Sequence, residues 1–542
     1  MNKQKSQDLR EAGVKSPGEP VSFYLKYKDE LPEVIELYSK FKVELPYFSS
    51  PRIRSLSHLQ TSCTTLRPVN GERNGVHFLT LDPDTASWLF LSEEEASLWP
   101  VLREGITYQA LRKRLKNWRA PRLRDFLTHL YRRGLLIIDG KPGLDPKIYD
   151  RGPLFWRSYL VEILLTERCN LACRYCYARG TPHREVMPMK TFRQAVDLAM
   201  TLPTNIMTIQ FAGGESFTHF SAFKKAVAYI EEQAKQVDKQ VEVIVQSNGT
   251  LLARPGVVDF LREHNIRIGI SLDGPCKIND MTRTYVDRRS SYHDTLRGLE
   301  AVRKGGLEVV GTLTVVGRHN IDRAEELLEF FTQLGLVGVR FNVIIAKGRG
   351  QDSWEEFGVT PGEYFEFMKT VIRYIGRTRA FREANLQHLV RNLVMRRRNF
   401  RCMRSPCGAG LDYLVISSEG DVYPCVHWLR EPGLKLGNVR ELDSLEWVFL
   451  SSSEVKEMAS RITNRIPGCR QCEWRHFCEG GCALGARDWH GTLLSPSPLC
   501  EYYRTIYPFL LDYLAYDPEF ANYMVPEVEV CRFDGDRSGG SA

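Results

Sequence analysis

From Tyr159 onward, short apolar runs alternate with amphipathic stretches along the chain. The runs have the length of buried strands, and the amphipathic stretches repeat apolar positions at helical spacing. The predicted strands lie at 159–165, 206–211, 241–245, 266–272, 309–316 and 337–345, and the helices between them at 191–201, 222–236, 257–263, 294–304 and 322–334. Six βα units in series predict an α/β fold with a parallel sheet, curled into a partial (β/α)6 barrel of the TIM type. Function is then expected at the carboxyl ends of the strands.

A smaller unit is predicted at residues 76–140. Ser92 and Glu95 have the spacing of a capping box, which predicts the start of a helix, and Gly134 ends a later one. Two apolar runs at 76–81 and 87–91, separated by Asp82-Pro83-Asp84, predict a hairpin. Basic helical stretches lie at 108–115 and 122–133, and a final strand is predicted at 135–138. Together they predict a winged-helix-like domain.

The remaining segments are less regular. Residues 1–75 form a lead-in, with a polar, disordered start at 1–20 and an unclassified part at 21–75. The predicted domains after the winged helix are the barrel at 155–350, connecting helices at 351–400, a cysteine-dense domain at 401–505, and a closing helix with its tail at 506–542. Within these, helices are expected at 362–374, 385–395 and 502–520.

Composition narrows the class of protein. The 542 residues are 43% hydrophobic and 26% charged, which is typical of a globular protein, and no run of 18 apolar residues predicts a membrane span. The polar N-terminus lacks the apolar core of a signal peptide, so we expect a cytoplasmic protein. There, 14 cysteines favour metal binding or redox chemistry over disulfides. A net charge of +8 fits an anionic partner without requiring nucleic acid.

Three cysteines follow the first barrel strand with the spacing C-x3-C-x2-C. Cys169, Cys173 and Cys176 supply three thiolates, whereas a saturated [4Fe–4S] cluster takes four, so one iron is left open for a ligand. A structural zinc site is the alternative, but it needs four protein ligands, and no His or further Cys follows at finger spacing. The motif, with Tyr175 before its last cysteine, resembles the radical SAM signature.

The resemblance implies a binding site for S-adenosylmethionine (SAM). Gly213-Gly214-Glu215, after the second strand, is similar to the family's GGE motif, which binds the amino group of the methionine moiety. Further contacts are implied at the ribose and the carboxylate, although ordinary polar loop residues are the alternative for them: Ser247, Asn248, Asp273 and Arg283. In this family an electron from the cluster cleaves SAM, and the resulting 5′-deoxyadenosyl radical takes a hydrogen atom from the substrate. A flavodoxin- or ferredoxin-type electron donor is expected.

Eight further cysteines lie between residues 402 and 500, which is the complete ligand set for two four-cysteine clusters. Two zinc sites are the alternative. The run from Cys469 to Cys482, and Cys407 followed by Tyr423-Pro424-Cys425, resemble the SPASM extension of radical SAM enzymes. The resemblance implies three [4Fe–4S] clusters in all, one of the auxiliary pair held by Cys402, Cys407, Cys425 and Cys482, and the other by Cys469, Cys472, Cys478 and Cys500.

Two positions bear on the chemistry. Sulfatase-maturing relatives carry a carboxylate directly after the Tyr-Pro-Cys cysteine, but this chain has Val426 there, which argues against formylglycine formation. His427 and Asp412 are nearby alternatives for a proton acceptor. Cys276, past the fourth strand, is either a hydrogen-atom donor for epimerisation or an inert buried thiol. Cys63 and Cys531 have no assigned role.

A winged helix before a radical SAM barrel resembles the leader-recognition element of enzymes that modify ribosomal peptides, in which the leader adds as a strand. The cations that suit an acidic leader are Arg112, Lys113, Arg114, Lys116, Arg119, Arg122 and Arg124. DNA binding through a basic helix and a merely structural role are the alternatives.

The prediction is therefore a maturase that abstracts hydrogen from a ribosomal precursor peptide and forms a C–C, C–O or C–S crosslink. Maturation of a protein side chain or quinone cofactor, and a DNA-binding iron–sulfur sensor, are the competing functions.

Overall fold

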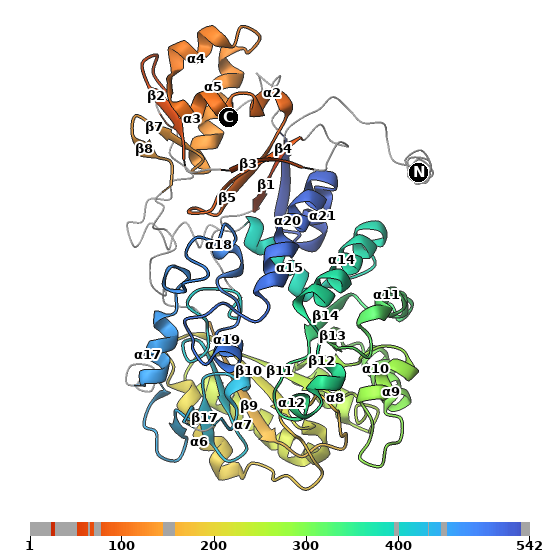
Figure 1. Ribbon diagram of the computed structural model, residues 1–542. Coiled ribbons are helices and arrows are strands. Elements are labelled where there is room, and N and C mark those ends of the chain that lie inside the picture. The colour runs from red at the N-terminus through yellow and green to blue at the C-terminus, as the bar shows by residue number, and fades with distance from the viewer. Residues whose placement is uncertain are drawn as a thin grey trace. The chain divides into compact units, whose positions relative to one another are not determined.

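The computed structural model describes residues 23–27, 51, 53–62, 65–69, 77–144, 158–394, 400–431, 433–445 and 452–532 (Figure 1). The chain divides into two compact units. The terminal unit comprises Met1–Tyr149, Leu393–Arg396 and Tyr507–Ala542, and the barrel unit comprises Asp150–Asn392 and Arg397–Ile506. The predicted disordered start at 1–20 and the end of the tail, at 533–542, lie outside the described residues. Within those residues, no helix combines the length and apolarity needed to cross a membrane.

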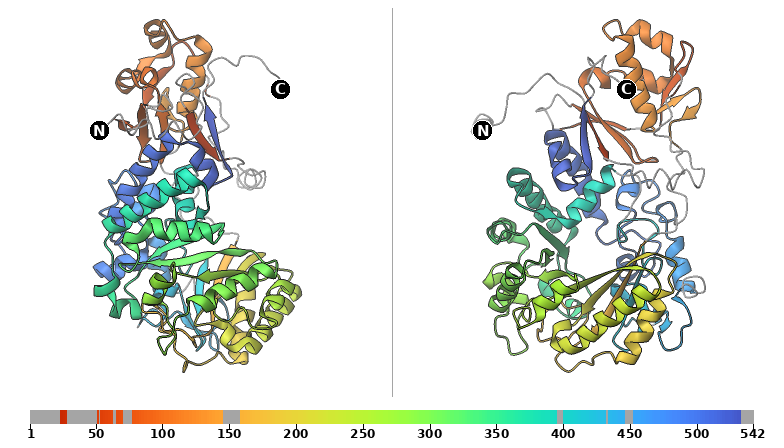
Figure 2. Two further views of the ribbon diagram at one scale, coloured as in Figure 1. Left: turned by 90° about the vertical axis from the view of Figure 1, so that its right-hand side faces the viewer. Right: turned by 180° about the vertical axis from the view of Figure 1, so that it is seen from behind.

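The barrel unit contains the six predicted strands, each hydrogen-bonded in parallel to the next along the chain. They are β9 (Ser158–Thr166), β10 (Ile206–Gly213), β11 (Gln240–Ser247), β12 (Arg267–Ser271), β13 (Val309–Val316) and β14 (Gly338–Val343). The predicted helices between them are confirmed as α6 (Met189–Met200), α7 (Phe220–Gln236), α8 (Val257–Glu263), α10 (Tyr292–Lys304) and α11 (Ala324–Gln333). These helices cover the outer face of the sheet, so the strand ends and the inner face are left for the site (Figure 2).

The cysteine-dense segment continues the same sheet, which the sequence did not predict. Its strands are β16 (Tyr413–Ile416), β17 (Asp421–Tyr423) and β18 (Gly437–Asn438), and β16 runs parallel to β9 with Val415 opposite Glu162. At the other edge, β15 (Arg382–Glu383) pairs with β14. The expected connecting helices are α14 (Pro361–Thr378) and α15 (Ala384–Val394), and the short helices of the extension are α17 (Ser453–Ser460), α18 (Arg475–Cys478) and α19 (Ala483–His490).

The terminal unit contains the predicted hairpin and helices but is larger than the predicted winged helix. The hairpin pairs β4 (Phe78–Asp82) with β5 (Ser87–Leu91), and Ser92 with Glu95 forms the expected capping box. Four helices follow the hairpin: α2 (Glu93–Ala96), α3 (Trp99–Glu104), α4 (Tyr108–Arg114) and α5 (Ala120–Arg132). Leu89, Trp99 and Leu127 share one apolar core.

Segments that the sequence left unclassified complete the sheets of this unit. Strand β3 (Thr65–Pro68) joins the hairpin as a third strand. The predicted wing strand, β7 (Leu136–Ile138), does not pair with the hairpin; it lies in a separate sheet with β6 (Ile106–Thr107), β2 (His58–Thr61) and β8 (Lys141–Pro142). The predicted closing helix is two helices, α20 (Cys500–Tyr516) and α21 (Glu519–Met524), and the last described strand, β19 (Val528–Arg532), pairs with β1 (Phe23–Tyr27).

Candidate functional site

The loop after β9 brings together the first thiol set, Cys169, Cys173 and Cys176. Burial raises the pKa of the Cys169 thiol, and the nearby Cys173 and Glu215 raise it further. Arg349 braces the loop, because its Nε donates to the Cys173 carbonyl at 2.8 Å and its Nη1 to the Gly180 carbonyl at 3.0 Å. Three neighbouring thiols, with no fourth thiol beside them among the described residues, have the composition of a [4Fe–4S] site with one open iron.

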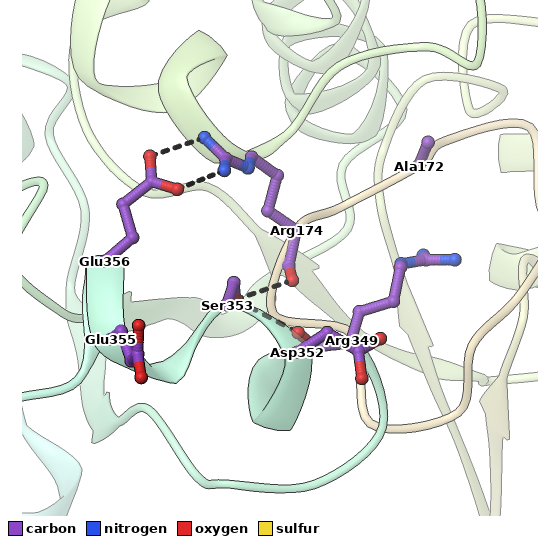
Figure 3. Close-up of a pocket in the computed structure, with 7 residues that line it drawn as sticks. All are labelled: Ala172, Arg174, Arg349, Asp352, Ser353, Glu355 and Glu356. Atoms are coloured by element: carbon purple, nitrogen blue, oxygen red, sulfur yellow. Dashed lines mark hydrogen bonds and ion pairs between the residues drawn. The ribbon is translucent and has the colours of Figure 1, made fainter.

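The outer side of this loop lines a cavity of about 440 Å³ (Figure 3). Arg174 forms a bidentate ion pair with Glu356 across it, and the Ser353 hydroxyl donates to the Arg174 carbonyl at 3.1 Å. Glu356 lies in the short helix α13 (Trp354–Phe357), and Ser353 joins this helix to α12 (Arg349–Asp352). The ion pair is exposed and contributes little free energy to holding the loop against the segment that follows β14.

The Gly-Gly-Glu motif packs directly against the cysteine loop. The Gly214 N–H donates to the Thr166 carbonyl at 3.0 Å, and the Glu215 N–H donates to the Arg168 carbonyl at 2.7 Å. A Cβ at Gly214 would lie 2.2 Å from the Arg168 carbonyl oxygen, so a side chain has no room there. The motif therefore owes its glycine to the close approach of two backbones.

Glu215 connects this motif to the end of β11. Its carboxylate accepts hydrogen bonds from the Asn248 N–H at 2.7 Å and from the Ser247 hydroxyl at 3.1 Å. The side-chain Nδ2 of Asn248 in turn donates to Asn170 Oδ1 at 2.9 Å and lies 3.9 Å from Cys169 Sγ. The residues expected at the amino group and ribose of SAM thus form one connected network at the thiols.

A second network links Tyr175, Asp273 and Arg283. The Tyr175 hydroxyl donates to Asp273 Oδ2 at 2.6 Å, and Arg283 Nη1 donates to the same hydroxyl at 2.9 Å. Arg283 is 6% exposed, yet its Nε has no hydrogen-bond partner, and both ring nitrogens of the buried His319, stacked on Tyr175, also have none. His319 Nε2 also lies 3.9 Å from Asp273 Oδ2. Buried nitrogens without a hydrogen-bond partner beside three thiols fit a site for a hydrogen-bonding ligand such as the methionine end of SAM.

The cysteines of the extension separate into two groups. Burial raises the pKa of the Cys425 thiol, and nearby Cys402, Cys482 and Cys407 thiolates raise it further; these four form the second thiol set. Burial also raises the pKa of Cys469 to about 12, with Cys500 and Cys472 contributing. Cys478 lies beside Cys469 and Cys472, which completes the third thiol set: Cys469, Cys472, Cys478 and Cys500.

The proton-acceptor candidates near Cys425 differ in their surroundings. Asp412 is 2% exposed and forms a bidentate ion pair with Arg404, at 2.5 and 2.9 Å, so its carboxylate is already neutralised. Burial lowers the pKa of His427, although Asp488 opposes that shift. Val426 packs in the apolar cluster around Tyr413, where it has no proton to exchange.

Among the described cysteines, Cys276 belongs to none of these groups. Cys276 begins α9 (Cys276–Thr282), and its thiol donates to Asp280 Oδ2 at 3.4 Å. Its pKa is raised by burial and by this contact with Asp280. Cys63 and the side chain of Cys531 lie outside the described residues.

Sequence reasoning missed two buried charged residues. Glu162, in the middle of β9, is 4% exposed and accepts a hydrogen bond from the Tyr413 hydroxyl at 2.7 Å. Arg461, 1% exposed, lies among the cysteine loops. The signal for Glu162 was available, because a lone carboxylate interrupts the apolar run of a strand that is buried on both faces.

Comparison with known proteins identifies the two cysteine-bearing segments. The family model of the radical SAM superfamily matches residues 163–331, and that of the SPASM iron–sulfur cluster-binding domain matches residues 407–473. The chain is 26% identical over 345 residues to a serine-type anaerobic sulfatase-maturating enzyme of Bacteroides thetaiotaomicron, covering 58% of this chain and 80% of that protein. It is also 26% identical over 326 residues to the Bacillus subtilis subtilosin biosynthesis protein AlbA, covering 59% of this chain and 66% of that one.

A similar fold occurs in Streptococcus suis SuiB bound to its precursor peptide SuiA. The TM-score is 0.50 at 17% identity, over 82% of this chain and 100% of SuiB. Residues 163–331 are thus a radical SAM domain and residues 407–473 a SPASM domain, and the chain is an enzyme of radical chemistry. Its cofactors are SAM, a SAM-binding [4Fe–4S] cluster and auxiliary iron–sulfur clusters.

Proposed function

We propose that this enzyme is a peptide maturase that oxidatively crosslinks a ribosomal precursor peptide. The observation that carries the proposal is that the eight cysteines of the extension separate into two groups of four neighbouring thiols. Hydrogen abstraction alone leaves an unpaired electron on the substrate, and a crosslink forms only when that electron is removed. Protein-bound one-electron acceptors supply this second oxidation.

We assign the first thiol set to the SAM-binding cluster, and the second and third sets to two auxiliary [4Fe–4S] clusters. Four thiols in each auxiliary set match the ligand number of a saturated cluster. When bound, SAM and its cluster supply the 5′-deoxyadenosyl radical that removes a hydrogen atom from the substrate. Arg283 would then hold the methionine carboxylate, while Gly213 and Gly214 leave room for residues 164–168 to pack against the motif.

Relatives support a peptide or protein substrate. AlbA takes part in the biosynthesis of subtilosin, a bacteriocin, and SuiB binds its precursor peptide SuiA. The sulfatase-maturating relative acts on a protein, but its type of chemistry is not proposed for this chain because Val426 is apolar. We propose that the enzyme works in the cytoplasm with a flavodoxin- or ferredoxin-type electron donor.

The terminal unit is the proposed site of leader recognition. Four of the seven candidate cations are exposed on or just after α4 and make no ion pair among the described residues: Arg112, Lys113, Arg114 and Lys116. By contrast, Arg122 pairs with Glu94, and Arg124 donates to the Ile53 carbonyl and stacks on Tyr108. The basic face that suits an acidic leader is therefore the end of α4.

The test is co-expression with short open reading frames beside the gene, followed by mass spectrometry of the peptides. Loss of two hydrogens per crosslink, with one 5′-deoxyadenosine released each time, is the expected result. Replacing Arg112, Lys113 and Arg114 by Glu should weaken leader binding in fluorescence anisotropy, whereas the paired Arg122→Glu change should weaken it less. A peptide-independent enzyme whose terminal unit binds DNA instead would contradict the proposal.

A further inference from the structure

The buried carboxylates of the barrel unit differ in what neutralises them. Glu167 pairs with Arg430 at 2.7 Å, and Asp412 pairs with Arg404. Glu162 instead has no Lys or Arg partner in the described part of the chain. Its carboxylate accepts hydrogen bonds from tyrosine hydroxyls, so it is buried without a compensating positive charge.

Glu162 lies between the first and second thiol sets. The Tyr413 hydroxyl donates to Glu162 Oε2 at 2.7 Å, and Tyr413 packs in one apolar cluster with Cys425 and Val426. The second hydroxyl partner is Tyr177, which directly follows Cys176 of the first set. Each tyrosine therefore connects the Glu162 carboxylate to a different thiol set.

The electrostatics of this position suit proton uptake. Burial raises the pKa of the Glu162 carboxyl, while the hydroxyls of Tyr413 and Tyr177 and the more distant His427 lower it. These are the titratable groups that face it. A carboxylate with a raised pKa, already oriented by two hydroxyls, is a better proton acceptor near neutral pH than an ordinary exposed glutamate.

We propose that Glu162 accepts the proton that the precursor peptide loses when its crosslink forms, an inference that rests on the proposed function. The substrate gives up one hydrogen atom to the 5′-deoxyadenosyl group and one electron to an oxidised iron–sulfur cluster. As the new bond forms, the attacking substrate atom releases its proton to Glu162 Oε. The peptide thus loses two hydrogens in total. One leaves as a hydrogen atom, and the other leaves as an electron, which the cluster takes up, and a proton, which Glu162 takes up.

The experiment compares Glu162→Gln with the wild type in the anaerobically reconstituted enzyme. Glutamine keeps the shape and can still accept the tyrosine hydrogen bonds. We expect unchanged iron content and leader affinity, continued 5′-deoxyadenosine release, and crosslinked product lowered by about 100-fold or more. An infrared carboxyl band that titrates in the wild type and is absent in the variant gives a readout independent of turnover. Glu242→Gln, an exposed strand carboxylate paired with Arg267, is the matched control and should behave like the wild type.

The outcomes separate the two proposals. If the wild type crosslinks the peptide and Glu162→Gln does so equally well with the same pH profile, the assignment of Glu162 is wrong and the proposed function stands. If the wild type releases 5′-deoxyadenosine but modifies no precursor peptide, the proposed function fails and this inference fails with it. If Glu162→Gln loses iron, the test is made with Tyr413→Phe instead. An unchanged ratio of product to 5′-deoxyadenosine in Tyr413→Phe overturns the inference.

A different observation concerns Arg461, whose side chain is 1% exposed. Its guanidinium donates to four backbone carbonyls, those of Leu493 at 2.7 Å, Gly480 and Ser495 at 3.0 Å, and Gly481 at 3.3 Å. In the part of the chain that the structure describes, it forms no ion pair with a carboxylate. Among the described residues, the hydrogen-bond partners of this buried positive charge are therefore neutral backbone carbonyls.

The negative groups near Arg461 are cysteines of both auxiliary sets. Burial lowers the pKa of its guanidinium, whereas thiolates of the second set, Cys407 and Cys482, and of the third set, Cys469 and Cys478, raise it. One cation is therefore shared by the two sets. Because a cluster becomes more negative by one unit when it takes up an electron, a nearby fixed positive charge favours its reduced form.

We infer that Arg461 sets the reduction potentials of both auxiliary clusters. The test is an EPR-monitored redox titration of the full chain carrying all its clusters. At an effective dielectric of about 20, removing a unit charge beside both sets should lower the reduction equilibrium constant of both auxiliary clusters about tenfold, and that of the SAM cluster less. Arg461→Gln removes the charge but keeps N–H donors, and Arg461→Lys keeps the charge. The exposed Arg465→Met is the matched control.

Lowered potentials in Arg461→Gln, with Arg461→Lys close to the wild type, support the inference. Unchanged potentials in an iron-replete Arg461→Gln overturn it. Equal shifts in the Gln and Lys variants also overturn it, because loop geometry and not charge would then be the cause. If Arg461→Gln fails to hold its clusters, Arg461→Lys decides alone, and a tenfold shift in that variant contradicts the inference.

Discussion

The buried ion pair between Arg404 and Asp412 offers a quantitative test of the cysteine-rich extension. The two side chains are 2% and 3% exposed, and their two contacts are 2.5 and 2.9 Å long. Asp412→Asn removes one charge and keeps the shape, so the Arg404 charge stays buried without this carboxylate. Breaking a buried pair in this way costs about 3–5 kcal/mol. Asp412 was a candidate proton acceptor from the sequence, and the same variant tests that role.

The assay is amide hydrogen exchange of residues 408–413 in the reconstituted enzyme. The Asp412 and Tyr413 amides donate to the Gly408 carbonyl, so they report local opening beside the ion pair. A loss of about 3–5 kcal/mol corresponds to exchange faster by about 150- to 5,000-fold. Lys435→Met breaks an exposed pair with Asp421 in the same domain and should cost less than about 1 kcal/mol.

A double variant separates charge burial from packing. Replacing Arg404 by Met and Asp412 by Leu removes both charges, and most of the lost protection should return. If Asp412→Asn instead exchanges like the wild type and keeps its iron, but forms no product, then Asp412 acts in the reaction. The reasoning from the ion pair would be refuted.

Three further changes have defined outcomes. Gly214→Ala places a Cβ 2.2 Å from a carbonyl of the cysteine loop, so about four of about 12 irons should be lost on reconstitution, whereas Gly362→Ala, with open space, should lose none. Half-buried His388 is stacked on Phe400, and burial lowers its pKa to about 3. As pH falls, the unfolded state therefore binds the proton first, and the free energy of unfolding should fall by about 1 kcal/mol between about pH 6.5 and 5.5. Urea titrations measure this loss, and His388→Phe should remove the pH dependence. Cys500→Ala should still release 5′-deoxyadenosine while losing most oxidised peptide, and normal peptide turnover by a folded variant lacking one cluster would contradict the electron-acceptor role.

The barrel could be predicted because its strands and helices carry long, uninterrupted periodic patterns. The strand predicted at 309–316 coincides with β13, and the helix predicted at 257–263 coincides with α8. Strands β2 and β3 were missed because each has four residues, and short strands carry little periodic signal. The partners of β2, β6 and β7, lie far along the chain, whereas β3 pairs with the nearby β4; pairing and not local periodicity determines both strands. The closing helix was predicted as one element, but Pro518 separates it into two.

The thiol sets followed from cysteine spacing and a family resemblance, whereas the charged residues between them did not. Glu162 and Tyr413 are 251 positions apart, so their hydrogen bond depends on the pairing of β9 with β16. Arg461 reads in the sequence as one of many surface arginines, since arginine is rarely buried without a carboxylate. Tertiary contacts alone distinguish these two residues from ordinary polar positions.

The pairing of β9 with β16 also fixes how the first and second thiol sets lie relative to each other. Strand β9 carries Glu162 and leads into the loop of Cys169, while β16 begins with Tyr413 and leads to Cys425 through a hairpin. A one-residue slip of β16 would turn Tyr413 to the opposite face of the sheet and break its hydrogen bond with Glu162. Backbone hydrogen bonds, not a flexible linker, therefore set the positions of the two thiol sets and of the carboxylate between them. Such a rigid connection suits an enzyme in which one substrate must give up a hydrogen atom, an electron and a proton to three acceptors that lie close together.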